Sequence, residues 1–334
     1  MKYPSIPQKT HVSTSPGRKL LLSGLVAIAT LGLSADANAD GRTPGSLLLF
    51  PEFDNREGDV TVLTVTNVDA AEVDIEFMYI GVEGVNGASV NCEEFNRTAT
   101  LTGKDTLTLL TRFHNPQQER GYVYVFAKEN GEASVHNGLI GSALVINGIQ
   151  QFDYSVNPVS FEGLGPDNGN GLRDLDGNEY EGAPGEILVP RFFGQGGNFS
   201  SDLILIGLTG GAAFDTTVDF AIYNDNEEMF SAEHTFHCWQ KSKLLEISGV
   251  FDNDFLRDNT NHDSSEIVGA SDYESGWFTV HGHMANSSTT TISSPAVYAV
   301  LVERAGAVGV SDLPFEAGQN FSGALLARSN DGTF

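Results

Sequence analysis

The sequence is poor in several residue types and motifs, and each shortage narrows the class of protein. Only 18 of its 334 residues are Lys or Arg, against 44 Asp or Glu, so the formal net charge is −26. A charge of this sign repels nucleic acids and anionic membrane surfaces. Nucleotide-binding loops, nucleophile elbows, zinc-protease motifs and dinucleotide fingerprints are all absent from the sequence. The sequence therefore indicates no particular reaction and argues against nucleic acid as a partner.

A long apolar run occurs once, near the start of the chain. Leu20–Leu33 (LLLSGLVAIATLGL) follows the basic pair Arg18-Lys19, and it is shorter than the ~20 residues that a membrane-spanning helix needs. Ala37-Asn38-Ala39 then gives the small-x-small pattern that signal peptidases accept. We expect residues 1–39 to be a signal peptide and the mature chain to begin at Asp40. The predicted location is extracellular or at the cell surface, with the periplasm as the alternative, and no integral membrane span is expected.

The second half of the sequence repeats segments of the first in the same order. Pro51 of LLLFPEF corresponds to Pro190 of ILVPRFF, and Gly121 of GYVYVF corresponds to Gly276 of GWFTVH. The spacing between matched residues grows slowly along the chain, as short loop insertions would make it grow. An ordered set of matches of this kind predicts an internal duplication.

The matched segments have the composition of β-strands. They are short and rich in Val, Ile, Leu, Phe, Tyr and Thr, and several alternate apolar with polar residues, as in VDIEFMYI at Val73–Ile80. Clusters rich in Gly, Asn and Asp separate them, as tight turns require. We predict an all-β protein with two tandem antiparallel β-sandwiches, Ig-like or jelly-roll-like, at 40–160 and 186–334. An acidic segment at 161–185 joins them.

The predicted junction at 161–185 contains a candidate calcium site. Its centre, NGNGLRDLDG at 168–177, resembles the loops of thrombospondin type 3 repeats and dockerins. Calcium takes about six to eight oxygen ligands, and glycines let a short chain fold around the ion. We therefore predict calcium as a cofactor with side-chain ligands from Asp167, Asn168, Asn170, Asp174 and Asp176. A polar linker that binds no ion is the alternative.

Cysteine is nearly absent, since the sequence holds only Cys92 and Cys238. In an exported chain two cysteines can form a disulfide. The alignment of the two halves places them at equivalent positions, so a bond between them would require packing around a pseudo-twofold axis close to both. We predict this bond as a staple between the sandwiches. In the alternative, each cysteine is a small buried apolar residue within its own sandwich.

Histidine supplies a second candidate metal site. His281 and His283 alternate along a predicted strand, so both imidazoles lie on one face and form half of a metal site. His234 and His237 lie in a neighbouring segment, from which a third ligand would come. Surface histidines without an ion are the alternative.

Together these features predict an exported, non-catalytic β-sandwich protein with a structural, adhesive or surface-binding role, stabilised by calcium. Its partner would be an extracellular protein, a polysaccharide or another copy of the chain. Two other functions stay open. One is a hydrolase or metal enzyme that uses the pair His281 and His283. The other is a pair of carbohydrate-binding modules, with sugar-binding faces lined by the aromatic residues Trp239, Trp277, Tyr122 and Tyr124.

Overall fold

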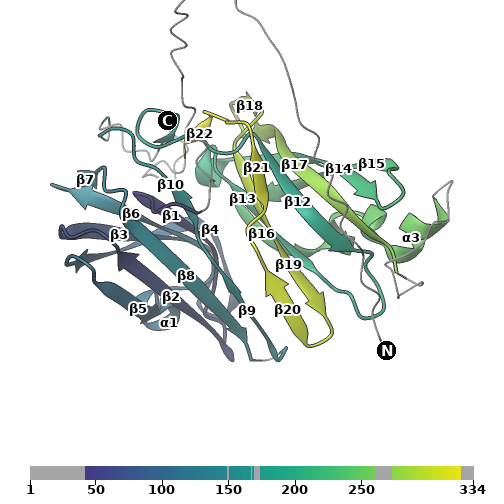
Figure 1. Cartoon of the computed structure of the whole chain (residues 1–334), viewed down its shortest axis with the longest axis horizontal. Helices are drawn as coiled ribbons and strands as arrows, with labels where there is room; N and C mark the ends of the chain where they lie inside the picture. The colour runs from purple at the N-terminus through teal and green to yellow at the C-terminus, as the bar shows by residue number, and fades with distance from the viewer. Residues whose placement is uncertain (1–41, 149, 167, 169–173, 260–272, 325–334) are drawn as a thin grey trace, which may run out of the picture. The chain divides into compact units, whose positions relative to one another are not determined.

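The described part of the chain is nearly all antiparallel β-sheet, as the sequence predicted (Figure 1). The structure is a computed structural model, and it describes residues 42–148, 150–166, 168, 174–259 and 273–324. The predicted signal peptide and two of the predicted calcium ligands, Asp167 and Asn170, lie outside these residues. Arg42–Phe334 form one unit, and the account below concerns that unit alone.

The first half forms two sheets. Sheet A consists, in spatial order, of β5 (Thr106–Leu110), β2 (Asp59–Asn67), β8 (Leu139–Asn147) and β9 (Phe152–Val156). Sheet B consists of β10 (Val159–Phe161), β1 (Leu47–Asp54), β6 (Gln118–Glu129), β3 (Val73–Gly84) and β4 (Ala88–Leu101), with β7 (Glu132–Ala133) beside β6. The short helix α1 (Thr111–His114) follows β5.

The second half repeats this arrangement strand for strand. Sheet C consists of β16 (Trp239–Lys243), β13 (Asp202–Gly207), β19 (Val297–Ala305) and β20 (Val308–Ser311). Sheet D consists of β21 (Phe315–Ala317), β12 (Glu186–Phe193), β17 (Ser275–Asn286), β14 (Asp215–Asn224) and β15 (Met229–His237), with β18 (Thr291–Ser293) beside β17. The helices α2 (Leu244–Ile247) and α3 (Asn253–Asp258) follow β16. Sheets C and A therefore correspond, as do sheets D and B.

The matched prolines and glycines occupy equivalent places in this repeat. The β1–β6 register shifts between Phe50 and Phe53, around Pro51, and the β12–β17 register shifts in the same way around Pro190. Proline has no N–H to donate, so it is tolerated at such a bulge. Gly121 and Gly276 pair with the strand just beyond each bulge, and both lie where a side chain would overlap a neighbouring carbonyl oxygen.

Alternation along the strands builds the core of each sandwich. In β2 buried and half-buried residues alternate, with Thr61, Leu63 and Val65 buried. On the facing sheet, Phe50 of β1 reaches β8, where a Cβ on Gly141 would lie 2.8 Å from its ring. The period of two thus turns one face of sheet A toward sheet B and leaves the other outside.

The inner strands of sheet B, β1, β6 and β3, are mostly buried on both faces because the second sandwich packs against the sheet. Residues on its outer face, such as Leu49, Tyr122 and Tyr124, are fully buried. Strand β1 lies beside β13 and β6 beside β16, so the outer face of sheet C covers this surface. The indole N–H of Trp239 donates to the Pro51 carbonyl at 2.8 Å across the contact. In Figure 1 the strands of sheet C lie between the first sandwich and sheet D.

The predicted disulfide between Cys92 and Cys238 is confirmed, but the reasoning from equivalent positions is wrong. Cys92 lies within β4, nine residues before that strand ends at Leu101. Cys238 directly follows the end of β15, the counterpart of β4. The two cysteines are therefore not equivalent, and no pseudo-twofold axis relates them. The halves meet through unlike surfaces, the outer face of sheet B and the outer face of sheet C.

Candidate functional site: the junction and the outer sheet faces

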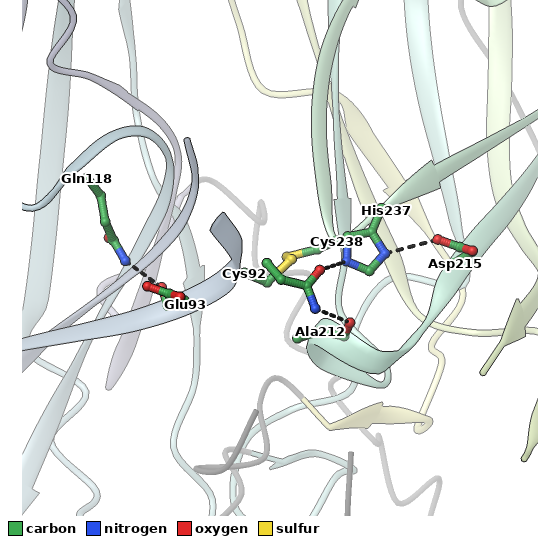
Figure 2. Close-up of a disulfide and its surroundings, with 8 residues drawn as sticks. Cys92, Glu93, Gln118, Ala212, Asp215, His237 and Cys238 are labelled. Carbon is green, nitrogen blue, oxygen red and sulfur yellow. Dashed lines mark hydrogen bonds and ion pairs between the residues drawn. A yellow bond between two sulfur atoms is a disulfide. The ribbon is translucent and has the colours of Figure 1, made fainter. Parts of the chain in front are cut away.

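The disulfide lies at one side of the junction, among polar contacts that also cross it (Figure 2). Both cysteines are buried, and their Cα atoms are 6.4 Å apart. Next to them, Asn91 Oδ1 lies 2.7 Å from His237 Nε2, and His237 Nδ1 lies 2.9 Å from Asp215 Oδ1. The bond therefore ties the edge strand of sheet B to the segment that connects sheets D and C.

A second polar cluster crosses the junction in its interior. Glu52, in the β1 bulge, is fully buried and accepts hydrogen bonds from Lys241 Nζ to both carboxylate oxygens at 2.9 Å. The hydroxyl of Tyr154, on β9, donates to the same carboxylate. Lys241 Nζ also donates to the Tyr154 hydroxyl at 2.9 Å. Burial raises the pKa of Glu52, and the charge of Lys241 offsets part of that rise. The ion pair joins β1 of the first sandwich to β16 of the second and holds these two strands together.

A cleft of about 190 Å³ opens beside this cluster, between the two sandwiches. Its walls carry four of the cations of an otherwise acidic molecule, Arg56, Arg120, Lys241 and Lys243. Most of them are already engaged by carboxylates. Arg56, for example, donates to Asp54 at 3.0 Å, and Lys241 binds Glu52. The cleft therefore offers little uncompensated positive charge to a ligand.

The described residues of the predicted calcium stretch are held by a residue that the sequence reasoning missed. Glu179 is buried, and its carboxylate accepts from the Asn168 N–H at 2.6 Å and the Asp174 N–H at 3.3 Å. Asp174 begins β11 (Asp174–Leu175), which pairs with β22 (Gly323–Ala324). The described part of 161–185 therefore contacts both halves of the chain, because Phe161 pairs with β1 of sheet B and β11 pairs with β22 near residue 324.

The carboxylate of Asp176 turns back on its own loop. It accepts from the Asn178 N–H and side-chain amide, each at 2.8 Å, and from the Glu179 N–H at 3.3 Å. Burial opposes ionisation, but these hydrogen bonds outweigh it and lower the pKa of Asp176. Its neighbours are backbone and amide donors, and calcium binding at this loop stays a prediction.

His281 and His283 do lie on one face of β17, and a third residue joins them. Asp219 of β14 pairs with His281 in the ladder, and its Oδ2 lies 3.5 Å from His281 Nε2 and 2.9 Å from His283 Nδ1. The other two histidines have different partners, because His234 contacts Gln240 at 3.0 Å and His237 lies at the disulfide. The ladder position of Asp219 opposite His281 was not visible in the sequence.

Asp219 and His283 form a hydrogen bond, and His281 lies within ion-pair distance of the same carboxylate. Within the residues that the structure describes, no group of three or more His, Cys, Asp or Glu is arranged to hold a metal ion. Across the same ranges, no helix is long and apolar enough to cross a membrane. The metal-enzyme alternative for this pair stays a prediction.

The four aromatic residues considered for sugar binding have different environments. Trp239, Tyr122 and Tyr124 are buried at the junction, so they cannot line an open sugar-binding face. Trp277 alone is partly open, with 38% of its surface exposed on the outer face of sheet D. Tyr223 of the next strand stacks on it, with ring centroids 4.3 Å apart and planes 7° apart. Of these four residues, Trp277 is therefore the one that a ligand could reach, and it lies in the second sandwich.

The described residues thus define a tandem antiparallel β-sandwich protein. No family model matches the sequence, and no curated protein matches it. Among solved structures, the empty top-component particle of cowpea mosaic virus is similar at 12% identity and a TM-score of 0.16. That match covers 92% of this chain and 100% of the viral one. A TM-score this low supports no argument, so the fold class rests on the sheets described above.

Proposed function

We propose that the protein is an exported, non-catalytic structural component that acts outside the inner membrane. The observation that carries this proposal is the junction, where sheets B and C bury their outer faces against each other. Contacts between domains of one chain are commonly small and polar, and they permit relative motion. Here a disulfide and the buried pair of Glu52 and Lys241 are added to an apolar contact. A unit built in this way suits a spacing or load-bearing role.

Two further features support export and ion binding. A disulfide persists in oxidising compartments outside the cytoplasm, which agrees with the signal peptide expected at 1–39. The high negative charge and the oxygen-rich segment at 161–185 favour calcium as a stabilising ion. Cells that express the full chain should therefore deliver a product beginning at Asp40 to an outer fraction. Recovery of the uncleaved chain in the cytoplasm would contradict the proposal.

The structural role is tested by the rigidity of the junction. Spin labels on Glu129→Cys in the first sandwich and Asp225→Cys in the second report the distance between them, since both sites are exposed. We expect one narrow distance distribution in the oxidised protein. A broad or two-peaked distribution would show that the sandwiches hinge, and a ligand clamp would then be the better interpretation.

Carbohydrate binding is the second candidate, and the Tyr223–Trp277 stack favours it. Exposed aromatic rings on a sheet face bind the apolar faces of sugars. On a glycan array the mature chain should then bind neutral or acidic polysaccharides, and Trp277→Ala should remove that binding. Trp239→Phe is the matched control, because Trp239 lies at the buried junction. A wild-type chain that binds no glycan would remove this candidate.

A further inference from the structure

A second, larger cleft opens between the two sandwiches, beside the one described above. Its volume is about 480 Å³, and it shares Gln150 and Lys243 with the smaller cleft. Sites for small molecules commonly have volumes of about 300–1,000 Å³. None of the described residues that line it is Asp or Glu, whereas Lys243 and Arg304 are basic. We call this surface the basic cleft, because its charge is opposite to the net −26 of the chain.

Arg304, on β19, supplies one of the two charges of the basic cleft. Its Nε donates to the Gly306 carbonyl at 2.9 Å, and its Nη1 donates to the side-chain carbonyl of Gln150, in the turn between β8 and β9. The guanidinium also lies over the ring of Phe152, with Cζ 4.7 Å from the ring centroid. All three partners are neutral. They hold the guanidinium in place across the junction without cancelling its charge.

Lys243, at the end of β16, supplies the second charge. Its Nζ donates to the Ser200 hydroxyl at 2.7 Å, while a carboxylate oxygen of Asp202 lies 4.0 Å away, at the limit of an ion pair. The Ser200 N–H donates in turn to the Arg304 carbonyl at 3.1 Å. Ser200 therefore links the two cations, and both line the same cleft.

Uncharged hydrogen-bonding groups form the rest of the wall. Asn198 follows two glycines with positive φ, Gly196 at +123° and Gly197 at +56°, which turn the loop between β12 and β13. The Gly306 N–H donates to the Asn198 carbonyl at 2.9 Å and holds this loop against the end of β19. The side chains of Asn198, Ser200 and Gln150 thus border the cleft together with the two cations.

This set of groups matches a ligand that carries both an oxyanion and hydroxyl groups. A guanidinium presents a planar fork of donors that fits the oxygens of a carboxylate or a sulfate, and an ammonium adds a compact positive charge. Hydroxyl and amide side chains both donate and accept, so they pair with the hydroxyls of a sugar. A cleft of this size also has room for more than a single inorganic ion.

We propose that the basic cleft binds an acidic saccharide through its carboxylate or sulfate group. Arg304 and Lys243 bind the oxyanion, and Asn198, Ser200 and Gln150 bind the neighbouring hydroxyls. The acidic surface elsewhere repels such a ligand, so its binding is confined to the cleft. This site goes beyond the proposed structural role, and it lies at the junction of the sandwiches, away from the Tyr223–Trp277 stack on sheet D.

The ligand class is tested by isothermal titration calorimetry of the oxidised mature chain with three hexasaccharides. One is hexagalacturonate, which carries carboxylates, the second is a sulfated hexasaccharide, and the third is the neutral maltohexaose. We expect at least one acidic probe to bind at least tenfold more tightly than maltohexaose. Preference for the first probe identifies a carboxylate ligand, and preference for the second identifies a sulfate ligand. Equal binding of both supports the shared chemistry.

The site is tested by single substitutions of its cations. Arg304→Gln and Lys243→Gln should each weaken binding of the acidic probe about tenfold or more, because each removes a charge-assisted hydrogen bond. Arg304→Lys keeps the charge but loses the fork, so its loss should be smaller than that of Arg304→Gln. Thermal unfolding confirms that each variant is folded.

Arg257→Gln is the matched control. Arg257 is exposed on α3 and does not line the cleft, and its loss makes the molecule more negative by the same one charge. We expect wild-type affinity in this variant. An equal loss of affinity there would show that general repulsion, and not the cleft, sets the binding.

Three other results would overturn the inference: no binding of either acidic probe to the wild type, equally tight binding of maltohexaose, or unchanged affinity in both Arg304→Gln and Lys243→Gln. Loss of binding in Trp277→Ala with retention in the cleft variants would instead place the ligand on sheet D. None of these outcomes bears on the export of the chain or the rigidity of its junction, so the proposed structural role fails or stands by its own tests.

Discussion

Gly121 lies where β6 and β3 approach too closely for any side chain. Its φ is +154°, and a Cβ there would overlap the Ile80 carbonyl oxygen. Gly276 occupies the equivalent place against Tyr223. Glycine is required here because both the conformation and the space exclude a methyl group. This explains why the two halves of the sequence share a glycine at this position.

We predict that Gly121→Ala destabilises the protein by more than about 3 kcal/mol, because backbone must move to admit the methyl group. Gly131→Ala is the control. Gly131 also has a positive φ, of +93°, but no atom lies within 4 Å of the added Cβ. It should cost only about 1 kcal/mol. Urea unfolding of both variants measures the difference, and equal losses would show that conformation alone, without the close approach, sets the cost.

The ion pair of Glu52 and Lys241 gives a second test by substitution of single residues. Glu52→Gln leaves the half-buried Lys241 without its carboxylate partner, so we expect a loss of about 3 kcal/mol at neutral pH. Replacing both residues, as Glu52→Gln with Lys241→Met, should restore much of that stability, since buried ion pairs often contribute little net energy. If the double variant were no more stable than Glu52→Gln, the unpaired charge of Lys241 would not be the cause of the loss, and the carboxylate of Glu52 would stabilise the fold in its own right.

The stability difference between wild type and Glu52→Gln should depend on pH, because the pKa of Glu52 is raised. Burial raises it above the ordinary value of 4.5, so the folded state binds the proton more tightly than the unfolded state. The stability that Glu52 gains from binding this proton is fully present below pH 4.5, and it is lost as pH rises through the pKa of the folded state. The stability of wild type relative to Glu52→Gln should therefore increase as pH falls from neutral toward 4.5. A relative stability that decreases over that range would contradict the direction of the shift.

At the scale of elements, calcium binding by the segment at 161–185 is tested by its effect on stability. If calcium binds there, it draws Asp174 and Asp176 together and joins the two sandwiches more firmly. Calcium should then raise the melting temperature more than magnesium at equal ionic strength, because magnesium supplies only the general screening of charge. Asp174→Ala with Asp176→Ala should remove the calcium-specific part. An unchanged calcium response in the double variant would show that the segment is a spacer.

The whole molecule depends on the disulfide for part of its stability. The bond closes a loop between residues 146 positions apart, and chain entropy assigns such a loop about 4–5 kcal/mol. The double variant Cys92→Ser, Cys238→Ser should therefore unfold at lower temperature yet remain folded, because the apolar contact of sheets B and C persists. Non-reducing peptide mapping should recover one linked pair from the wild type. Two titratable thiols in protein from an oxidising compartment would contradict the bond.

The sequence by itself determined the fold class, because the alternation of apolar residues and the placement of turn residues are local properties of the chain. It also revealed the repeat, since Pro51 and Pro190 fill the same bulge. It named the two cysteines of the disulfide but gave the wrong reason for their meeting. The sequence alignment placed the two cysteines at equivalent positions. The strand pairing shows that Cys92 lies inside β4, whereas Cys238 lies just after β15, the counterpart of β4.

Only the tertiary structure decided how the sandwiches meet and which residues become surface. Tyr122 and Trp277 occupy equivalent places in the repeat, yet one is buried and the other exposed, because the second sandwich covers sheet B and nothing in the described residues covers sheet D. The same contact brought Lys241 to Glu52 across 189 positions of sequence. Burial depends on what packs from a distant part of the chain, and a local pattern carries no record of that packing.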